Sequence, residues 1–384
     1  MSSTKDTGLL VPGGARSLEA LKEEVARRTE RGGPPLSGIA VEDARSALAA
    51  IGTLEREQWA CAFSRVAEAH FERGAKLESP DRAAASREFW QAWRLHHFAR
   101  WPTENAPARR HAKRRALDAF QRYSRLLDPP METLRVPLDG KPVVAYLRAP
   151  QGRSPAPVVL AISGLDSRKE DIAAHTDAYL QRGMAVVAVD MPGTGEAPVP
   201  PTDARPERMF TALIDYLLTR PDLDAARLVV QGRSFSGYWA ARLAYTERER
   251  LRGVVMHGGP IHHTFQPGWC AQALETGEYL YDYFEAWRGM MGADTLEEML
   301  REVARLSLLD MGLLDRPCAP MLVVNGARDS QITIEDAFLL LRHGDAKDAW
   351  INPQGGHMGR SPQWPPAAIA EKVLLPWMAK KLQA

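Results

Sequence analysis

The sequence predicts an α/β protein in which an all-helical region precedes a mostly parallel sheet covered by helices on both faces. Up to about residue 127 the chain is rich in Ala, Arg, Glu and Leu and has few β-branched runs. After Pro129-Pro130, short continuous apolar runs alternate with helical stretches, which is typical of strands buried in a parallel sheet. We therefore expect a helical domain at 1–131 and a sheet domain at 132–384.

The helical region divides at capping residues and prolines. Ser17 precedes an amphipathic run and is expected to cap the first helix. One or two further helices are expected within 41–77, another at 80–100 and a long one at 106–127. The double proline at 129–130 ends the helical pattern because the residue before a proline avoids the α-region.

The sheet region begins with a hairpin. Strands are expected at 133–138 and 142–147, joined at Asp139-Gly140. Buried strands should follow at 157–162, 184–189, 228–230, 254–256 and 321–324, with a last short strand at 348–351. Ligands of such sheets bind at the carboxyl ends of the strands, so the residues that follow each strand are the candidates for chemistry.

One strand end carries a serine motif. Ser234 lies between Gly232 and Ser236, after an apolar strand and before a helical run at 238–244. A serine with small flanking residues at a strand-to-helix turn indicates the nucleophile elbow of an α/β-hydrolase. The usual pattern has Gly at the place of Ser236, and Ser is the smallest departure from it. A structural glycine turn explains the motif about as well when it is taken alone.

The partners of a nucleophilic serine follow in the expected order. In this fold a carboxylate and then a histidine come after the serine. Asp329 follows the strand at 321–324, and His357 lies in a Gly-rich loop after the strand at 348–351. We therefore assign Ser234 as nucleophile, His357 as base and Asp329 as the acid that orients it.

The oxyanion hole needs two backbone N–H donors. One should be Phe235, which follows the nucleophile, and the second should be Leu165 in the loop after the strand at 157–162. The His257-Gly258-Gly259 run resembles the oxyanion motif of lipases. It follows the elbow instead of preceding it, so we interpret it as a turn into a lid at about 260–312.

Composition narrows the class of protein. The 384 residues carry 49 Lys and Arg against 48 Asp and Glu, which gives no reason to expect a nucleic-acid partner. Three scattered cysteines fit a reducing compartment. The chain shows neither a signal-peptide pattern nor an apolar run long enough to span a membrane, so we expect a soluble cytoplasmic protein. His262-His263 has no nearby partner at ligand spacing, and we expect no metal and no cofactor.

Three motifs together resemble a known family. The runs at 164–170, 189–196 and 232–238 resemble those of the FrsA-like α/β-hydrolases, and the similarity extends from about residue 87 to the end of the chain. Within that family the sequence is similar to members that cleave carbon–carbon bonds and to fungal polyketide-shortening hydrolases. The resemblance implies that the helical domain is a cap over the active site, and that the protein is a homodimer acting on a small-molecule acyl or ketone substrate.

The resemblance also singles out Asp166. A Glu assists carbon–carbon cleavage at the matching place in the family, and Asp166 is one methylene shorter. It can donate a proton or orient a substrate carbonyl, but closing a turn or pairing with a nearby cation explains it equally well. The sequence favours cleavage of a carbon–carbon bond beside a ketone, with a carboxylesterase as the alternative and a non-catalytic binding module as a third reading.

Aromatic and polar residues suggest a substrate pocket. Trp269 belongs to an aromatic-rich lid, and Trp93 and His97 share an aromatic helix face. Packing against the core accounts for these aromatic residues about as well. The residues that we expect around the pocket are Trp93, His97, Arg233, His263 and Trp269.

Overall fold

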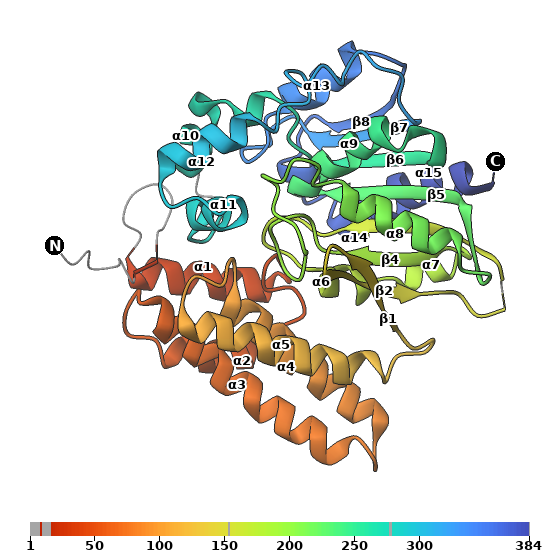
Figure 1. Ribbon diagram of the computed structural model, residues 1–384. Coiled ribbons are helices and arrows are strands. Elements are labelled where there is room, and N and C mark those ends of the chain that lie inside the picture. Colours follow the sequence, from red (N-terminus) through yellow and green to blue (C-terminus); the bar gives the residue numbers. More distant parts are fainter. Residues whose placement is uncertain (1–7, 10–16, 153, 276–278, 384) are drawn as a thin grey trace. The chain divides into compact units, whose positions relative to one another are not determined.

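A computed structural model describes residues 8–9, 17–152, 154–275 and 279–383 (Figure 1). Its described residues divide into two compact units. One comprises the residues up to Pro130 together with Leu274–Gly289, and the other comprises Met131–Ala273 and Met290–Ala384. The helical unit thus includes a segment taken from the expected lid, which the composition of the chain did not indicate.

Among the described residues of the first third of the chain, the helical unit contains five helices. They are α1 (Leu18–Glu30), α2 (Val41–Ala49), α3 (Arg56–Leu77), α4 (Arg82–Arg100) and α5 (Pro107–Ser124). Ser17 caps α1 by accepting a hydrogen bond from the Ala20 N–H at 3.1 Å. Helix α4 begins two residues later than expected, because Asp81 caps it by accepting from the Ala84 N–H at 2.9 Å.

The other unit is built on one eight-stranded sheet with the order β1-β2-β4-β3-β5-β6-β7-β8. Strands β1 and β2 form the antiparallel hairpin, β2 pairs antiparallel with β4, and every other pair in the sheet is parallel. The strands are β1 (Glu132–Leu138), β2 (Lys141–Arg148), β3 (Ala156–Ile162), β4 (Ala185–Val189), β5 (Leu223–Arg233), β6 (Gly253–His257), β7 (Met321–Gly326) and β8 (Asp348–Asn352). The mostly parallel sheet predicted from the sequence is confirmed.

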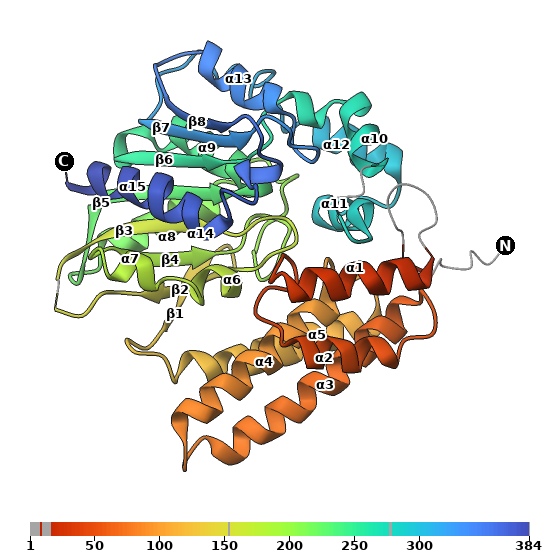
Figure 2. The ribbon, with the colours of Figure 1, turned by 180° about the vertical axis from the view of Figure 1, so that it is seen from behind.

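Helices cover both faces of this sheet. Figure 1 shows α8 and α9 on the near face, and Figure 2, from behind, shows α14 and α15 on the opposite face. Strand β3 is buried along its whole length, as expected for a strand covered on both sides. The helices along this part of the chain are α6 (Lys169–Ala173), α7 (Asp177–Leu180), α8 (Arg208–Leu218), α9 (Gly237–Thr246), α10 (Pro267–Glu275), α11 (Tyr283–Met291), α12 (Leu296–Ala304), α13 (Ile334–Arg342), α14 (Pro366–Ile369) and α15 (Leu375–Gln383). Most of α11 belongs to the helical unit.

Candidate active site

The serine sits on a strained turn between β5 and α9. Ser234 follows the last residue of β5 and has a φ of 55°, which is rare for a residue with a side chain. Gly232 is required here, because a Cβ at this position would collide with the Ser236 carbonyl group. The sequence therefore folds into a sharp elbow that presents Ser234 at the carboxyl end of the sheet.

Ser236 occupies the place where the usual pattern has glycine. Its side chain is fully buried. The hydroxyl oxygen accepts a hydrogen bond from the Arg233 N–H at 2.9 Å and lies 2.8 Å from the Ile162 carbonyl oxygen, to which it donates. The hydroxyl thus ties the elbow to the end of β3, a bond that a glycine lacks.

A histidine and an aspartate lie in line with Ser234. His357 Nε2 is 2.8 Å from Ser234 Oγ, and His357 Nδ1 is 2.8 Å from Asp329 Oδ2. Because a carboxylate only accepts, Nδ1 carries the ring hydrogen, and Nε2 is left to accept from the serine hydroxyl. The structure brings together the three residues that the sequence selected from three separate strand ends.

Asp329 is held as an anion. Its side chain is fully buried, and burial opposes ionisation. His357 and the N–H groups of Gln331 and Ile332, at 2.9 and 3.0 Å, outweigh that cost and hold the pKa of Asp329 below its ordinary value. The carboxylate is therefore charged at neutral pH and fixed in orientation.

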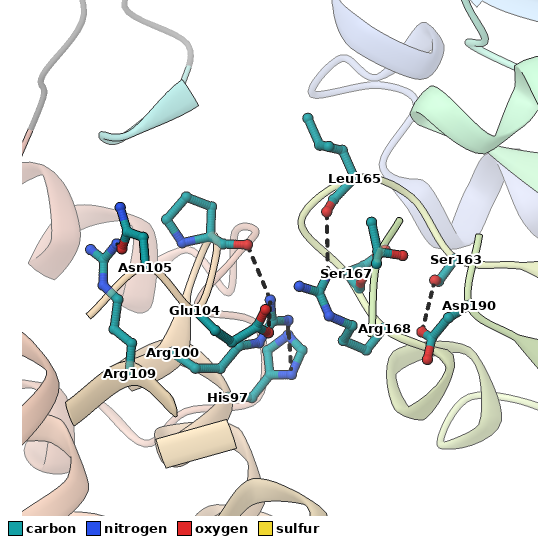
Figure 3. A network of polar contacts seen from close by, with 12 residues as sticks. His97, Arg100, Glu104, Asn105, Arg109, Ser163, Leu165, Ser167, Arg168 and Asp190 are labelled. Carbon is teal, nitrogen blue, oxygen red and sulfur yellow. Dashed lines mark hydrogen bonds and ion pairs between the residues drawn. The ribbon is translucent and has the colours of Figure 1, made fainter. Parts of the chain in front are cut away.

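The loop from Ser163 to Arg168 lies beside the elbow. A Cβ on Gly164 would be 3.4 Å from Ser234 Cβ, so the two backbones approach closely. The Gly164 N–H donates to Ser167 Oγ at 2.8 Å, and the Arg168 guanidinium donates to the carbonyl oxygens of Leu165 and Ser167 at 3.2 and 2.7 Å (Figure 3). This loop carries Leu165 and Asp166, and the Asp166 side chain is half-buried.

A buried charge cluster supports the same loop. Asp190, which follows β4, accepts hydrogen bonds from Ser163 Oγ (Figure 3), the Lys169 N–H, Lys169 Nζ and the Glu196 N–H at 3.2, 2.8, 3.1 and 3.0 Å. Burial opposes its ionisation, but Lys169, Arg168 and these donors lower its pKa. Asp190 thus ties the backbone of the Ser163–Arg168 loop to the turn that contains Glu196.

The residues expected around the pocket fall into both units. In the sheet unit, Trp269 Nε1 donates to the Gln331 carbonyl oxygen at 3.1 Å, which places this indole beside the loop of Asp329. His263 is half-buried, and its N–H donates to Asp336 at 2.7 Å. Arg233 is half-buried directly before Ser234.

Trp93 and His97 lie in the helical unit. Trp93 has no exposed surface and packs edge-on against Phe120 at 5.0 Å between ring centroids. This placement does not support Trp93 as a pocket residue, because a side chain surrounded by its own helices has no surface for a ligand. His97 is also buried and accepts from the Arg100 guanidinium, with 2.7 Å between Arg100 Nη2 and the ring Nε2 (Figure 3).

Within the part of the chain that the structure describes, no group of three or more His, Cys, Asp and Glu side chains is arranged to hold a metal ion. The helices in those same residues include none that is long and apolar enough to cross a bilayer.

A family model for FrsA-like esterases matches residues 47–349, which is most of the chain. The chain belongs to the FrsA-like esterase family. The resemblance predicted from the three motifs is therefore confirmed.

Two relatives show how far the likeness of this FrsA-like chain extends. The 2,6-dihydropseudooxynicotine hydrolase of Paenarthrobacter nicotinovorans is 29% identical over 253 residues, which cover 65% of this chain and 65% of the relative. Esterase FrsA of Escherichia fergusonii is 31% identical over 204 residues, which cover 52% of this chain and 48% of the relative. The match thus spans between about half and two thirds of the length of these relatives.

A solved structure extends the likeness to the fold. The crystal structure of the 2,6-dihydroxy-pseudo-oxynicotine hydrolase superimposes with a TM-score of 0.75 at 23% identity, covering 90% of this chain and 93% of that one. The α/β-hydrolase fold predicted from the sequence is therefore confirmed.

Sequence reasoning missed two buried residues near the site of this FrsA-like protein. Asp336 accepts from three successive N–H groups at the start of the lid, those of His262, His263 and Thr264, at 2.7–3.1 Å. His257, dismissed as part of a turn, donates to the Met358 carbonyl oxygen with 2.9 Å between the heavy atoms. Asp336 belongs to no motif, and the motif-like run that contains His257 gives no sign of its contact with Met358, so only the fold reveals what each residue contacts.

Proposed function

We propose that this protein is a serine hydrolase that cleaves an acyl bond through Ser234, His357 and Asp329. The observation that carries the proposal is the continuous contact from Asp329 Oδ2 through the His357 ring to Ser234 Oγ, with 2.8 Å at each step. A serine hydroxyl becomes a useful nucleophile only when a base removes its proton during attack, and this arrangement supplies that base.

The reaction proceeds in two halves. Ser234 Oγ attacks the substrate carbonyl carbon while His357 Nε2 takes the hydroxyl proton and Asp329 stabilises the imidazolium. The N–H groups of Phe235 and Leu165 hold the oxyanion, and each such donor contributes about 3 kcal/mol in the transition state. The tetrahedral intermediate then collapses, the bond to the leaving group breaks, and that group departs with the proton that the imidazolium gives up, directly or by way of Asp166. Water attacks the remaining acyl-enzyme with the neutral His357 as base, which releases a carboxylic acid and regenerates Ser234.

We propose further that the bond cleaved lies between carbons beside a ketone, in a β-diketone-like, aryl ketone or polyketide substrate. A carbon leaving group is a poor anion, so it must be protonated or leave as an enol when the bond breaks. Asp166 lies in the oxyanion loop next to Leu165, and its side chain is half-buried. A general acid at this place typically contributes about 10²–10⁴-fold to the rate. The likeness to 2,6-dihydropseudooxynicotine hydrolase also supports this choice.

A carboxylesterase is the second candidate. The family model and one of the two relatives are named for esterase activity, and an alkoxide leaving group takes its proton from His357 without another acid. The same serine relay serves both reactions, so Asp166 separates them.

Labelling with a fluorophosphonate probe tests whether Ser234 is an activated nucleophile. We expect the probe to label the wild type, and the Ser234→Ala variant to lose both labelling and turnover. Ser37→Ala, which removes a half-buried hydroxyl in the helical unit, should label as the wild type does. Failure of the folded wild type to react would favour the non-catalytic reading.

Assays of aryl ketones, 1,3-diketones and p-nitrophenyl esters in parallel test which type of bond the protein cleaves. Asp166→Asn should slow diketone cleavage by about 10²-fold or more and leave ester hydrolysis within about threefold. Asp118→Asn, at a largely exposed carboxylate, is the matched control. Turnover of esters alone would remove the carbon–carbon proposal and leave the esterase. The cap role of the helical domain and the homodimer stay predictions.

A further inference from the structure

We propose that His257 is a positioning residue for the catalytic histidine, acting through the peptide of Met358. The proposal rests on the proposed function, because it assigns to His257 the task of keeping His357 aligned with Ser234. It adds a fourth side chain to the three that make up the relay, one that touches neither the serine nor the substrate.

The contacts of Met358 carry the proposal. His257 is the last residue of β6, and its Nε2–H donates to the Met358 carbonyl oxygen at 2.9 Å. Asn325, in β7, accepts from the Met358 N–H at 3.1 Å through its side-chain oxygen. Both side chains are buried, so two neighbouring strand ends hold the residue that directly follows His357.

The backbone at Met358 needs such support. Its φ of 62° lies in the left-handed region, which is unfavourable for a residue with a side chain. Gly258, next to His257, leaves room for it, because a Cβ on Gly258 would be 2.9 Å from Met358 Cγ. Without the Nε2–H of His257, we expect this peptide to relax toward an ordinary conformation and to turn the His357 ring away from Ser234 Oγ.

The charge state of His257 suits this task. Burial, together with the nearby Arg233 from β5 and His357 and Arg360 from the loop after β8, lowers the pKa of His257 to about 3. On β7 the residue paired with His257 is Val324, which carries no charge. The ring is therefore a neutral donor at working pH, and it adds no positive charge beside His357 when that ring takes the serine proton.

A donor that aligns the base should affect reactivity more than binding. His257→Phe keeps a flat ring but removes the donor, whereas the Nε2 of His257→Gln reaches about the same place and can still donate. We expect fluorophosphonate labelling of Ser234 to slow by about 10–100-fold in the Phe variant, with a changed pH profile, and to stay within about threefold in the Gln variant. His343→Phe, at an imidazole beside Asp315, is the control and should not alter labelling.

The experiment measures the second-order labelling constant from pH 5 to 9 for the wild type and the three variants, with thermal unfolding of each. Wild-type rates in the Phe variant, or equal losses in the Phe and Gln variants, would overturn the positioning role. A wild type that never labels would instead remove the proposed function itself.

A measurement on the wild type needs no variant to fold. Side-chain nitrogen NMR should show His257 as a neutral ring with its hydrogen on Nε2 from pH 8 down to about 5. A ring that titrates near its ordinary pKa of about 6.5, or that carries the hydrogen on Nδ1, contradicts the proposal.

Discussion

The two units of this protein use buried charges for different ends. In the helical unit, Asp282 is fully buried and receives the guanidinium of Arg56 at 2.9 and 3.0 Å and that of Arg109 at 2.7 Å. In the sheet unit, the equally buried Asp329 contacts a histidine whose other nitrogen faces a serine hydroxyl. A carboxylate between two guanidinium groups, which do not lose their protons, stabilises the fold. A carboxylate that is hydrogen-bonded to an imidazole leaves the other ring nitrogen able to take up a proton.

Two histidines show the same contrast. His70, in the helical unit, has Glu88 and Asp43 at 2.7 and 2.8 Å from its two nitrogens. Burial opposes its charge, but the two carboxylates prevail and raise its pKa. His257 faces cations and a carbonyl group, and its pKa falls to about 3. Burial lowers the pKa of both rings, and only His70 has carboxylate partners that outweigh it.

The largest expected effect is a loss of activity on substituting Asp329 in the sheet unit. Asp329→Asn removes the charge that stabilises the imidazolium and disturbs the tautomer of His357, so kcat should fall by about 10³–10⁴-fold with little loss of stability. Initial rates on an activated ester measure it. Asp310→Asn, at an exposed carboxylate in the lid, should keep full activity. A loss below about tenfold would mean that Asp329 resembles Asp282 in being structural.

The corresponding substitution in the helical unit is Asp282→Asn, and it should change stability instead of activity. Asp282→Asn leaves two buried guanidinium groups without their anion, and we expect it to lower the free energy of unfolding by about 3 kcal/mol. Denaturant titration measures the change. Asp118→Asn, at a largely exposed carboxylate that pairs with Arg115, should cost less than about 1 kcal/mol. Equal effects of the two substitutions would refute the structural role of Asp282.

An intermediate effect is expected at Asp190, which contacts the loop from Ser163 to Arg168. Asp190→Asn keeps its shape but weakens the contacts with Lys169 and Ser163 that hold the loop, so the labelling rate of Ser234 should fall by about 10–100-fold. Asp177→Asn, at an exposed carboxylate that pairs with Arg148, is the control. An unchanged rate, with a loss of stability only, would place Asp190 with the structural charges.

The smallest effect is a dependence of stability on pH. Because folding raises the pKa of His70, its stabilisation is complete below about pH 6.5 and is lost as the pH rises through the folded value. The stability advantage of the wild type over His70→Gln should therefore shrink between pH 6 and pH 9, by about 1 kcal/mol or less. An advantage that grows with pH would show that His70 is neutral in the folded protein.

His257 should show the opposite dependence. Its folded pKa is depressed, so the stability that it contributes is present above about pH 6.5 and is lost as the pH falls toward 3. The stability contributed by His70 should therefore fall as the pH rises, and that contributed by His257 should fall as the pH drops.

Local patterns predicted much of this structure. The alternation of apolar runs and helices identified the strands, and the order of Ser234, Asp329 and His357 after three of them selected residues that the structure places in contact. These signals are local because a strand end and the loop after it are encoded by adjacent residues.

Contacts between distant segments were beyond such patterns. Asp282 lies in the expected lid but binds Arg56 and Arg109, and Asp336 in α13 binds the start of the lid. Trp93 was assigned to a pocket because an aromatic helix face looks alike whether it meets a ligand or another helix. Which distant residue each of these side chains contacts depends on the tertiary fold, and local sequence periodicity carries no information about it.

The segment around Asp282 also bears on how the two parts of the gene product can be separated. Tyr281 packs edge-on against Trp101 and Trp59, at 5.0 and 5.8 Å between ring centroids, although it is encoded more than a hundred residues after those helices. A protein shortened to begin after Pro130 would keep Tyr281 and lose the Trp59 and Trp101 rings on which it packs. The first third of the chain is therefore not an interchangeable module, and recombination between relatives must carry both stretches together to preserve a folded product.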